Sequence, residues 1–394
     1  MKRILAVFLC FILSFSGLSI VCVAQTGSQT VTKSGDSATE YTLDIKAKSV
    51  ILMEPNTGKI LYEDNADEIL PPASITKVMS LLLVMEALDR GDFDLETVVS
   101  ASEHACSMGG SQIWLEPNES MTVDDLLKAT VIVSANDATV ALGELVAGSE
   151  EGFVALMNQR AKELGMTNTT FKNCSGLDSE GHLTSAHDVA VMSSELIKHE
   201  LIKNYTTVWM DSLRNGESEL VNTNKLVRFY NGTTGLKTGT TSGSGYCLSA
   251  TAERDGLSLV AVVMGADTTS DRFEGAKKLL DFGFSNFSYT EIDADLKNDF
   301  CVEVADGVKD SLKVKADGSF SLLLKKSDTA QITKKTVIDK KISAPIKKGD
   351  AVGIVKIYSG KEQIGEIKLL ADENINKLTF LRVFIRVFKG LFVL

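Results

Sequence analysis

The sequence predicts an α+β protein in which a region of mixed helices and strands precedes a small all-β region. Apolar residues recur at helical spacing over residues 75–88 and again after Thr122, a pattern typical of packed helices. We expect Thr122 to cap the second of these helices. Two apolar runs, residues 246–252 and 257–264, indicate buried strands. From Glu291 the chain alternates apolar and polar residues and is rich in lysine. This change of pattern predicts a second domain built from strands.

Length and charge restrict the function classes. The chain has 394 residues, enough for two to three domains at about 150 residues each. Its 44% hydrophobic and 24% charged content is that of a globular protein with a sizeable core. The net charge of −11 argues against a general nucleic-acid binder. With four histidines and no clustered Cys/His spacing, we expect no structural zinc site.

The N-terminus has the pattern of a signal peptide over residues 1–24. Lys2 and Arg3 form a basic start, residues 4–20 are almost uniformly apolar, and Cys22-Val23-Ala24 offers small residues at the −3 and −1 positions. These features predict export with cleavage before Gln25. A lipoprotein site at Cys22 is disfavoured, because Val21 is bulky where such sites require a small residue. An uncleaved membrane anchor is an alternative to the signal peptide. Residues 25–43, rich in Thr, Ser and Gly, predict a flexible leader.

Four cysteines follow the signal peptide: Cys106, Cys174, Cys247 and Cys301. Export permits disulfide bonds, and four cysteines allow three pairings that the sequence does not distinguish. We expect these residues to be unpaired, buried small hydrophobic side chains.

The segment around Ser74 is the first candidate site. A predicted hairpin, with strands at residues 49–53 and 59–63, leads to Pro71-Pro72, which favours an extended approach to the next element. Ser74 then starts the apolar helical pattern and Lys77 lies one turn later. An amine at this spacing can help to deprotonate a hydroxyl nucleophile. The alternative is an N-cap serine followed by a surface lysine.

Ser134 and Asn136 form the second candidate site. The polar stretch from Ser134 to Asp137 interrupts two apolar helical runs, which predicts a loop between helices. Such loops often carry functional residues, although a plain helix cap is an alternative. His182 and His187 are near a predicted helix cap at Ser185 or Thr184, and we assign them no chemistry.

A third segment contains Lys237, Thr238 and Gly239. A turn precedes it, and we expect Lys237 to start a strand. A lysine at the open end of a strand, with glycines nearby, suits an anion that approaches the backbone closely.

The last twenty residues differ from the β-region. Apolar residues cover a wide arc of a helical wheel over residues 375–394, whereas Arg382, Arg386 and Lys389 share one stripe. We expect a basic amphipathic helix that lies on an anionic membrane surface. The alternative is a terminal helix that docks on the β-domain.

Ser74-x-x-Lys77, Ser134-Ala135-Asn136 and Lys237-Thr238-Gly239 occur in this order in an exported chain. Together with Asp271-Arg272-Phe273, they resemble the serine D-alanyl-D-alanine carboxypeptidases, which are low-molecular-mass penicillin-binding proteins. The resemblance implies three parts: a catalytic domain (44–290) with an antiparallel sheet flanked by helices, a β-domain (291–374) and an anchor helix (375–394). Ala135 departs from the glycine of many relatives, at a position that contributes backbone.

The resemblance also implies a mechanism. Ser74 attacks the carbonyl of the penultimate D-Ala of a peptidoglycan stem peptide, and Lys77 is the expected proton acceptor. Ser134 returns a proton to the leaving amine. The remaining implied contacts are to the substrate, and they come from Asn136, Lys237, Thr238, Gly239, Thr240 and Arg272. The backbone N–H groups of Ser74 and Thr240 are the expected oxyanion hole.

The implied partners are stem peptides that end in D-Ala-D-Ala and β-lactams that acylate Ser74. No metal or organic cofactor is implied. The expected location is the outer face of the cytoplasmic membrane, with the chain anchored by its C-terminus. A β-lactamase, a transpeptidase and a non-catalytic penicillin-binding sensor remain alternatives. The predicted β-domain and anchor argue against the first of these, and the intact Ser74 and Lys77 against the last.

Overall fold

The computed structural model describes residues 42–296, 300–326, 332–339 and 342–380. The predicted signal peptide, most of the leader and the last fourteen residues of the predicted anchor helix lie outside these ranges. The described residues from Leu43 onward belong to one compact unit.

A five-stranded antiparallel sheet forms the centre of the first domain. Its strand order is β2-β1-β9-β8-β7, with bounds β1 Ser49–Glu54, β2 Lys59–Asp64, β7 Thr233–Thr241, β8 Gly245–Arg254 and β9 Leu257–Ala266. The predicted hairpin of β1 and β2 and the predicted strands β8 and β9 are confirmed. Strand β7 pairs with β8 and lies at one edge of the sheet.

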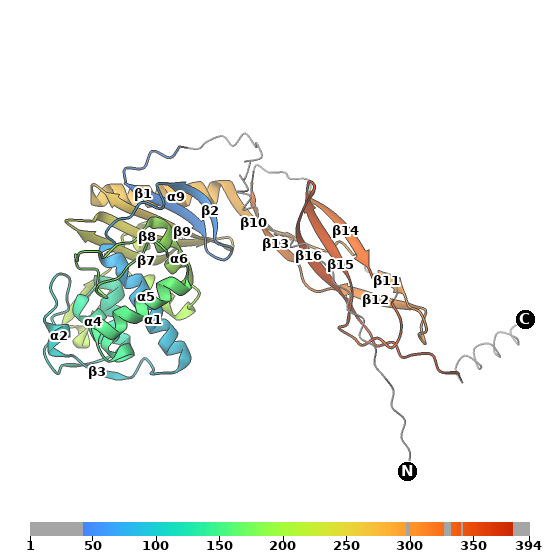
Figure 1. Cartoon of the computed structure of the whole chain (residues 1–394), viewed down its shortest axis with the longest axis horizontal. Helices are drawn as coiled ribbons and strands as arrows, with labels where there is room; N and C mark the ends of the chain where they lie inside the picture. The colour runs from blue at the N-terminus through green and yellow to red at the C-terminus, as the bar shows by residue number, and fades with distance from the viewer. Residues whose placement is uncertain (1–41, 297–299, 327–331, 340–341, 381–394) are drawn as a thin grey trace, which may run out of the picture. The chain divides into compact units, whose positions relative to one another are not determined.

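Helices cover both faces of this sheet (Figure 1). On one face, the cluster that contains Ile51 and Val262 packs with residues of α1 (Lys77–Arg90), α4 (Asn136–Ala147), α5 (Glu150–Glu163) and α6 (Ala186–Leu196). On the other face, Leu52 and Val263 pack with α9 (Thr269–Asn286). Because side chains alternate along a strand, β1, β8 and β9 each supply both cores.

Shorter elements connect these layers. They are β3 Val98–Ser100, α2 Glu103–Cys106, β4 Ser120–Thr122, α3 Val123–Lys128, a π-helical segment Ala129–Val133, α7 Lys203–Thr206, β5 Met210–Leu213, β6 Ser218–Val221 and α8 Leu226–Phe229. Two predicted helix caps are confirmed. Thr122 Oγ1 accepts a hydrogen bond from Asp125 N at 3.1 Å, and Ser185 Oγ accepts one from Asp188 N at 3.2 Å. Each cap satisfies a backbone donor that has no partner within its helix.

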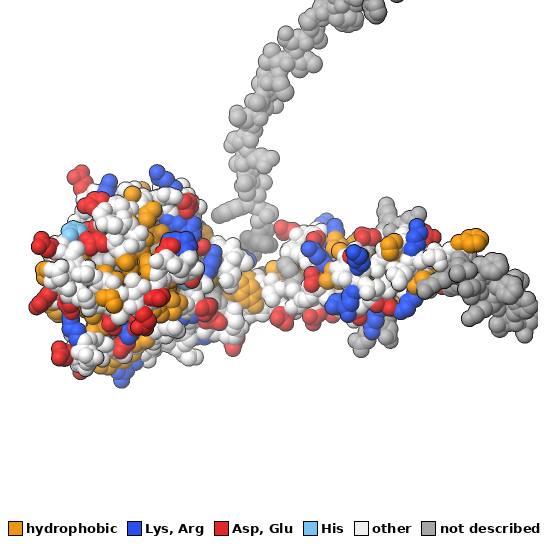
Figure 2. Space-filling view, turned by 90° about the horizontal axis from the view of Figure 1, so that it is seen from below, with side chains coloured by type: hydrophobic (Ala, Val, Ile, Leu, Met, Phe, Trp, Pro, Cys, Tyr) orange, Lys and Arg blue, Asp and Glu red, His pale blue; other side chains and the backbone are white. Residues whose placement is uncertain are grey.

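The C-terminal region is built from strands, as predicted. β10 (Phe287–Ile292) pairs with β13 (Phe320–Lys325). A second sheet has the order β11-β12-β16-β15-β14, with bounds β11 Cys301–Glu303, β12 Ser311–Ala316, β14 Ile332–Ile338, β15 Ala351–Ser359 and β16 Glu362–Ala371. Leu312 and Val314 are buried whereas Lys313 and Lys315 are exposed. The lysines of this region thus contribute basic groups to its surface, where they lie beside acidic side chains (Figure 2).

The helix predicted from residue 375 starts later than expected. Ile375 is fully buried and forms a β-bridge with Ile346, and Leu378 N donates to Asp306 O at 2.7 Å. Pairing with the β-region therefore holds residues 375–378, and Phe380 is the first helical residue described in this segment. In the part of the chain that is described, no helix combines the length and apolar composition needed to cross a bilayer.

All four cysteines outside the signal peptide are unpaired. Cys174 and Cys247 are buried, as expected, and Cys106 is partly buried. The expectation is wrong for Cys301, which is exposed because it lies on the outward face of β11.

Candidate active site

Ser74 lies in a short 3₁₀ turn, Ala73–Thr76, directly before α1. Neither the turn nor α1 has a side-chain N-cap hydrogen bond, so the alternative of Ser74 as a capping residue is wrong. The preceding residue, Ala73, has φ +48°, a left-handed conformation that side chains disfavour. Ser74 thus stands half-buried at a sharp entry to the helix.

Lys77 points back to Ser74 from the first turn of α1. Its Nζ lies 3.1 Å from Ser74 Oγ, 2.6 Å from Asn136 Oδ1 and 2.6 Å from Ser175 O. The side chain is fully buried. Because burial disfavours the charged form, the pKa of Lys77 falls to about 7.

These three contacts suit a neutral amine. The oxygens of Asn136 and Ser175 only accept hydrogen bonds, and both are closer to Nζ than Ser74 Oγ is. A neutral amine has two N–H donors and one lone pair. If the donors engage these two oxygens, the lone pair remains for the Ser74 hydroxyl. The arrangement can therefore remove a proton from Ser74.

Ser134 and Asn136 lie where the π-helical segment ends and α4 begins. Ser134 has φ +66° and is 4% exposed. Its Oγ has no hydrogen-bond partner among the described residues. Asn136 is fixed more firmly, since Nδ2 donates to Gly109 O at 2.6 Å and its backbone N donates to Ser111 O at 2.7 Å. The amide oxygen of Asn136 is thereby directed at Lys77.

The prediction that Lys237 starts a strand is wrong. Lys237 is the fifth residue of β7, because pairing with β8 already begins at Thr233 and continues through Gly235. Glycine and threonine in this stretch give a weak strand pattern. Lys237 is buried, its Nζ donates to Thr238 O at 3.0 Å, and burial holds its pKa well below the usual value.

Gly239 brings β7 against the Ser74 turn. A Cβ at Gly239 would lie 3.0 Å from both Pro72 O and Ile75 N, so a side chain would push the strand away. Arg272, from α9, reaches the same place. Its Nη1 donates to Thr240 Oγ1 at 2.9 Å and to Gly239 O at 3.2 Å. Burial lowers the pKa of Arg272, but a guanidinium stays charged.

The structure thus joins six of the predicted residues in two linked groups, whereas the side chains of Ser134, Lys237 and Thr238 form no hydrogen bond to either group within the described part of the structure. Ser74, Lys77 and Asn136 are joined by hydrogen bonds, as are Gly239, Thr240 and Arg272. Contacts of Gly239 with Pro72 and Ile75 connect the groups. Thr238 Oγ1 donates to Thr223 Oγ1 at 2.8 Å. Within the described ranges, no three His, Cys, Asp or Glu residues are placed to hold a metal ion.

The loop that contains Ser175 and Gly176 was given no role from the sequence. Ser175 O is one of the two closest acceptors of Lys77. Gly176 has φ +90°, and a Cβ there would lie 1.9 Å from Ala73 O. Only glycine fits this approach. In the sequence, the available signal was the glycine at the end of the polar stretch before Leu177. That signal did not show that Gly176 would pack against the backbone of Ala73.

His182 was also given no role, and the structure places it under the Ser74 turn. Its Nδ1 accepts a hydrogen bond from Lys172 N at 2.8 Å, and its Nε2 lies 2.7 Å from Thr76 Oγ1. Thr76 Oγ1 in turn donates to Ala73 O at 2.8 Å. Because Nδ1 accepts, Nε2 carries the hydrogen of the neutral ring. Burial lowers the pKa of His182 to about 4, which keeps the ring neutral.

Comparison with known proteins identifies the family. The family model described as peptidase S11, D-alanyl-D-alanine carboxypeptidase, matches residues 34–268. The chain belongs to this family. A second model, described as the C-terminal domain of penicillin-binding protein 5, matches residues 297–377 of the carboxypeptidase.

Curated relatives support the same assignment over nearly the whole chain. The D-alanyl-D-alanine carboxypeptidase DacF of Bacillus subtilis (strain 168) is 41% identical over 385 residues, which cover 97% of this chain and 96% of DacF. The D-alanyl-D-alanine carboxypeptidase DacC of Escherichia coli (strain K12) is 35% identical over 353 residues, covering 86% and 88%.

Solved structures agree. Penicillin-binding protein 5 from Haemophilus influenzae has 30% identity and a TM-score of 0.69, covering 86% of this chain and 99% of that one. Penicillin-binding protein D2 from Listeria monocytogenes, in its ampicillin-bound form, has 33% identity and a TM-score of 0.57, covering 62% of this chain and 100% of that one. The predicted α+β fold class is confirmed. The protein is a serine-type D-alanyl-D-alanine carboxypeptidase of the penicillin-binding type.

Proposed function

We propose that the carboxypeptidase removes the terminal D-Ala of peptidoglycan stem pentapeptides through an acyl-enzyme on Ser74. The observation that carries this proposal is the contact between Lys77 Nζ and Ser74 Oγ at 3.1 Å, in a buried site where the pKa of Lys77 is about 7. A lysine with such a pKa exists partly as a free base at neutral pH, as a general base requires.

The acylation step follows from this contact. The Ser74 hydroxyl proton moves to Lys77 Nζ while Oγ bonds to the carbonyl carbon of the penultimate D-Ala. The oxyanion is placed between the backbone N–H groups of Ser74 and Thr240, where hydrogen bonds stabilise developing negative charge. The packing of Gly239 against Pro72 and Ile75 supports this placement, because it holds β7 beside the serine turn.

The leaving group requires a proton and its carboxylate requires a binding site. When the C–N bond breaks, Ser134 passes its hydroxyl proton to the D-Ala amine with help from Lys237, and it recovers a proton from the Lys77 ammonium, which returns to the neutral amine. Lys237, Thr238 and Arg272 bind the terminal carboxylate, for which a guanidinium has a matching planar shape. Asn136 holds a substrate amide. Water then cleaves the Ser74 ester, the stem peptide leaves as a carboxylate, and Ser74 regains its proton.

Release of D-Ala tests this function directly. We expect the detergent-extracted full-length protein to release D-Ala from a peptide that ends in D-Ala-D-Ala, and the Ser74→Ala variant to release none. We also expect Ser74→Ala to lose covalent labelling by a fluorescent penicillin. Turnover of the β-lactam without D-Ala release would contradict the proposal and favour a β-lactamase. Transfer of the acyl group to an added amine in preference to water would favour a transpeptidase.

We further propose that the protein is exported and held on the outer face of the cytoplasmic membrane by its C-terminal segment. The sequence pattern supports this, with basic residues on one stripe and aromatic and aliphatic residues elsewhere in residues 380–394. Deletion of residues 378–394 is expected to move the protein from the membrane fraction to the soluble fraction. If the truncated protein still sediments with membranes, the N-terminal segment is the anchor instead.

A further inference from the structure

The loop that supplies the Ser175 carbonyl is held from α1 by two side chains. Lys77 Nζ lies 2.6 Å from Ser175 O, and Ser80 Oγ donates to Cys174 O at 2.6 Å. Residues three apart on a helix are neighbours on its surface, so Lys77 and Ser80 reach two consecutive carbonyls from one side of α1. The position of the Ser175 carbonyl therefore depends on a residue that lies outside the three sequence motifs.

A second helix holds the same residue of the loop. Glu150 Oε1, in the first turn of α5, accepts a hydrogen bond from Cys174 N at 3.0 Å. The N–H and the C=O of Cys174 belong to successive peptide groups, each of which is planar. The two contacts thus fix both planes. The next carbonyl along the chain is that of Ser175, which has little freedom to turn away from Lys77 while the planes before it are held.

The contact between Ser80 and the loop is shielded from water. Ser80 is 2% exposed, Cys174 is 0% exposed and Ser175 is 1% exposed. A buried carbonyl that loses its donor leaves a polar atom without compensation, because water does not reach it. Removal of the Ser80 hydroxyl is therefore expected to make the loop rearrange rather than to leave Cys174 O where it is.

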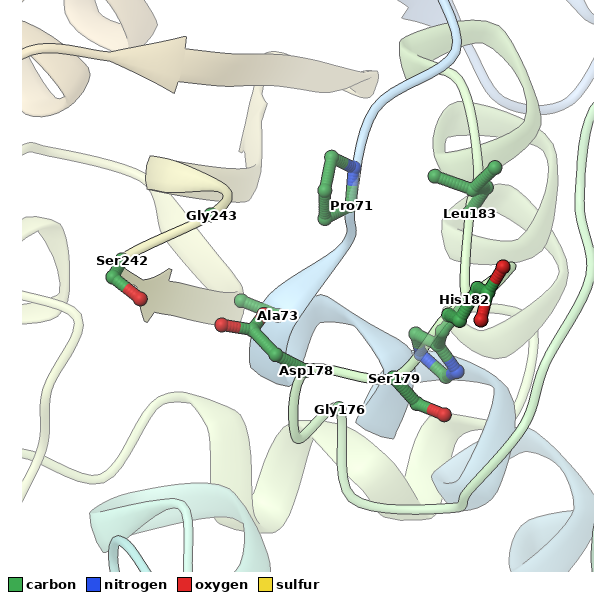
Figure 3. Close-up of a pocket in the computed structure, with 10 residues that line it drawn as sticks. Pro71, Ala73, Gly176, Asp178, Ser179, His182, Leu183, Ser242 and Gly243 are labelled. Atoms are coloured by element: carbon green, nitrogen blue, oxygen red, sulfur yellow. The ribbon is translucent and has the colours of Figure 1, made fainter.

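The loop also borders the place where a substrate would bind. Figure 3 shows Gly176, the residue after Ser175, beside Ala73, and both line a pocket of about 420 Å³ next to the Ser74 turn. Ser80 is not part of this lining. It is therefore placed to act on Lys77 through the loop, and not on a bound substrate.

We propose that Ser80 is a positioning residue for the acylation of Ser74. The inference rests on the proposed function, in which Lys77 takes the Ser74 proton. By fixing the loop, Ser80 keeps Ser175 O on one N–H of the neutral Lys77 amine. The lone pair of this amine then faces Ser74 Oγ. Without the Ser80 hydroxyl, the Ser175 carbonyl shifts, the amine turns with it, and proton transfer slows.

Two substitutions at Ser80 test the role of its hydroxyl, since Ser80→Ala removes it and Ser80→Thr keeps it. We expect Ser80→Ala to lower the maximal rate at which a fluorescent penicillin acylates the full-length protein by about ten- to a hundredfold, the cost of a displaced catalytic group. The penicillin concentration that gives half of this rate is expected to stay unchanged, because Ser80 does not line the pocket. Ser80→Thr is expected to recover most of the rate.

The pH–rate profile separates the position of Lys77 from its protonation. In Ser80→Ala we expect the plateau at high pH to fall and the midpoint to stay near pH 7, because burial sets the pKa of Lys77 and an alanine keeps the amine buried. Ser194→Ala on α6 is the matched control. Ser194 Oγ also donates to a backbone carbonyl, Ala190 O at 2.8 Å, and the residue is 7% exposed. This control is expected to keep the plateau.

Glu150 provides an independent test of the shared loop. Glu150→Leu removes the acceptor of Cys174 N and is expected to slow acylation, whereas Glu150→Gln keeps an acceptor oxygen and is expected to keep most of the rate. If Ser80 and Glu150 act through the same peptide groups, the double variant Ser80→Ala/Glu150→Leu loses less than the product of the two single losses.

The outcomes separate this proposal from the proposed function. An unchanged plateau in Ser80→Ala overturns the positioning role, even if the thermal midpoint of unfolding falls, because Ser80 then serves folding alone. A Ser80→Thr variant that folds but stays as slow as Ser80→Ala also overturns it, as do losses that simply multiply in the double variant. These results leave the carboxypeptidase mechanism intact. If the unmodified protein is not acylated and releases no D-Ala, the proposed function fails, and the role of Ser80 fails with it.

Discussion

The side-chain amide of Asn136 is held in one orientation, with Oδ1 2.6 Å from Lys77 Nζ and Nδ2 2.6 Å from Gly109 O. Because Nδ2 must donate to the Gly109 carbonyl, Oδ1 is the atom that faces the lysine. Asn136 therefore takes up one N–H of Lys77 without adding a charge. Burial lowers the pKa of Lys77 to about 7, and the contact with Asn136 fixes the position of the amine.

The rate of acylation is expected to rise with pH through about 7 and then to level off. Only the neutral amine of Lys77 accepts the Ser74 proton, and its fraction increases as pH rises through the lowered pKa. Below this pKa the rate is expected to fall about tenfold for each pH unit. The measurement is the second-order rate constant for labelling by a fluorescent penicillin between about pH 5 and 9. A rate that is flat, or that falls over this range, would rule out a neutral Lys77 as the base.

Asn136→Asp tests the same relationship by adding a negative charge at the same atoms. A carboxylate 2.6 Å from Nζ stabilises the protonated amine, so the pKa of Lys77 is expected to rise. The rising limb of the pH–rate profile then moves to higher pH, by about one unit or more. An unchanged midpoint would show that the titrating group in the profile is not Lys77.

Ser134→Ala is expected to reduce D-Ala release about 10²- to 10⁴-fold, the usual contribution of a positioned proton donor. The expected change in folding stability is small, because the Ser134 hydroxyl has no hydrogen-bond partner to lose among the described residues. The two measurements are D-Ala release and the thermal midpoint of unfolding. A variant that unfolds earlier and keeps its activity would assign Ser134 a structural role.

Gly176→Ala is expected to impair both folding and acylation, since the new Cβ would lie 1.9 Å from Ala73 O. Gly165→Ala is a matched control, because Gly165 also has a left-handed backbone (φ +74°) but has nothing within 4 Å of its Cβ position. The control is expected to lose about 1–2 kcal/mol from the conformation alone. The free energy of unfolding, measured with urea, is expected to fall further in Gly176→Ala than in Gly165→Ala. The difference is the cost of the clash between the new Cβ and Ala73 O. Equal losses in the two variants would show that the loop moves aside.

His182→Leu is expected to slow acylation without moving the pH midpoint. The change leaves Lys172 N and Thr76 Oγ1 without the ring atoms that they contact, at about 1–3 kcal/mol for an unsatisfied buried group. His182→Gln supplies an amide N–H toward Thr76 and is expected to recover part of the rate. Because the ring acts only through Thr76 and Ala73, the midpoint of the pH–rate profile, which Lys77 sets, is expected to stay near pH 7. A shifted midpoint would instead show that His182 exchanges a proton with the site.

Several features could be read from the sequence because local patterns determine them. The caps at Thr122 and Ser185 depend on a hydroxyl three residues before a backbone N–H, and both were predicted. The apolar runs of β8 and β9 indicated two strands of the central sheet in the same way. The three short motifs identified the nucleophile region and its companions, since their order along the chain carries the family pattern.

Other features depended on contacts between distant segments. The position of Lys237 inside β7 was predicted wrongly, because pairing with β8 extends the strand through residues with weak strand preference. Cys301 was expected to be buried, but the face of β11 on which it lies is set by pairing with β12.

The sequence by itself determined which residues are available for the chemistry: a serine with a lysine one turn later, a polar loop between helices and a basic strand. Only the tertiary structure decided the state of these residues. Lys77 has a lowered pKa because packing buries it, and α4 and the loop at Ser175 supply the oxygens that hold its amine in place. These groups lie 59 and 98 residues away along the chain. Burial and hydrogen-bond geometry at such separations arise from packing, which no local pattern encodes.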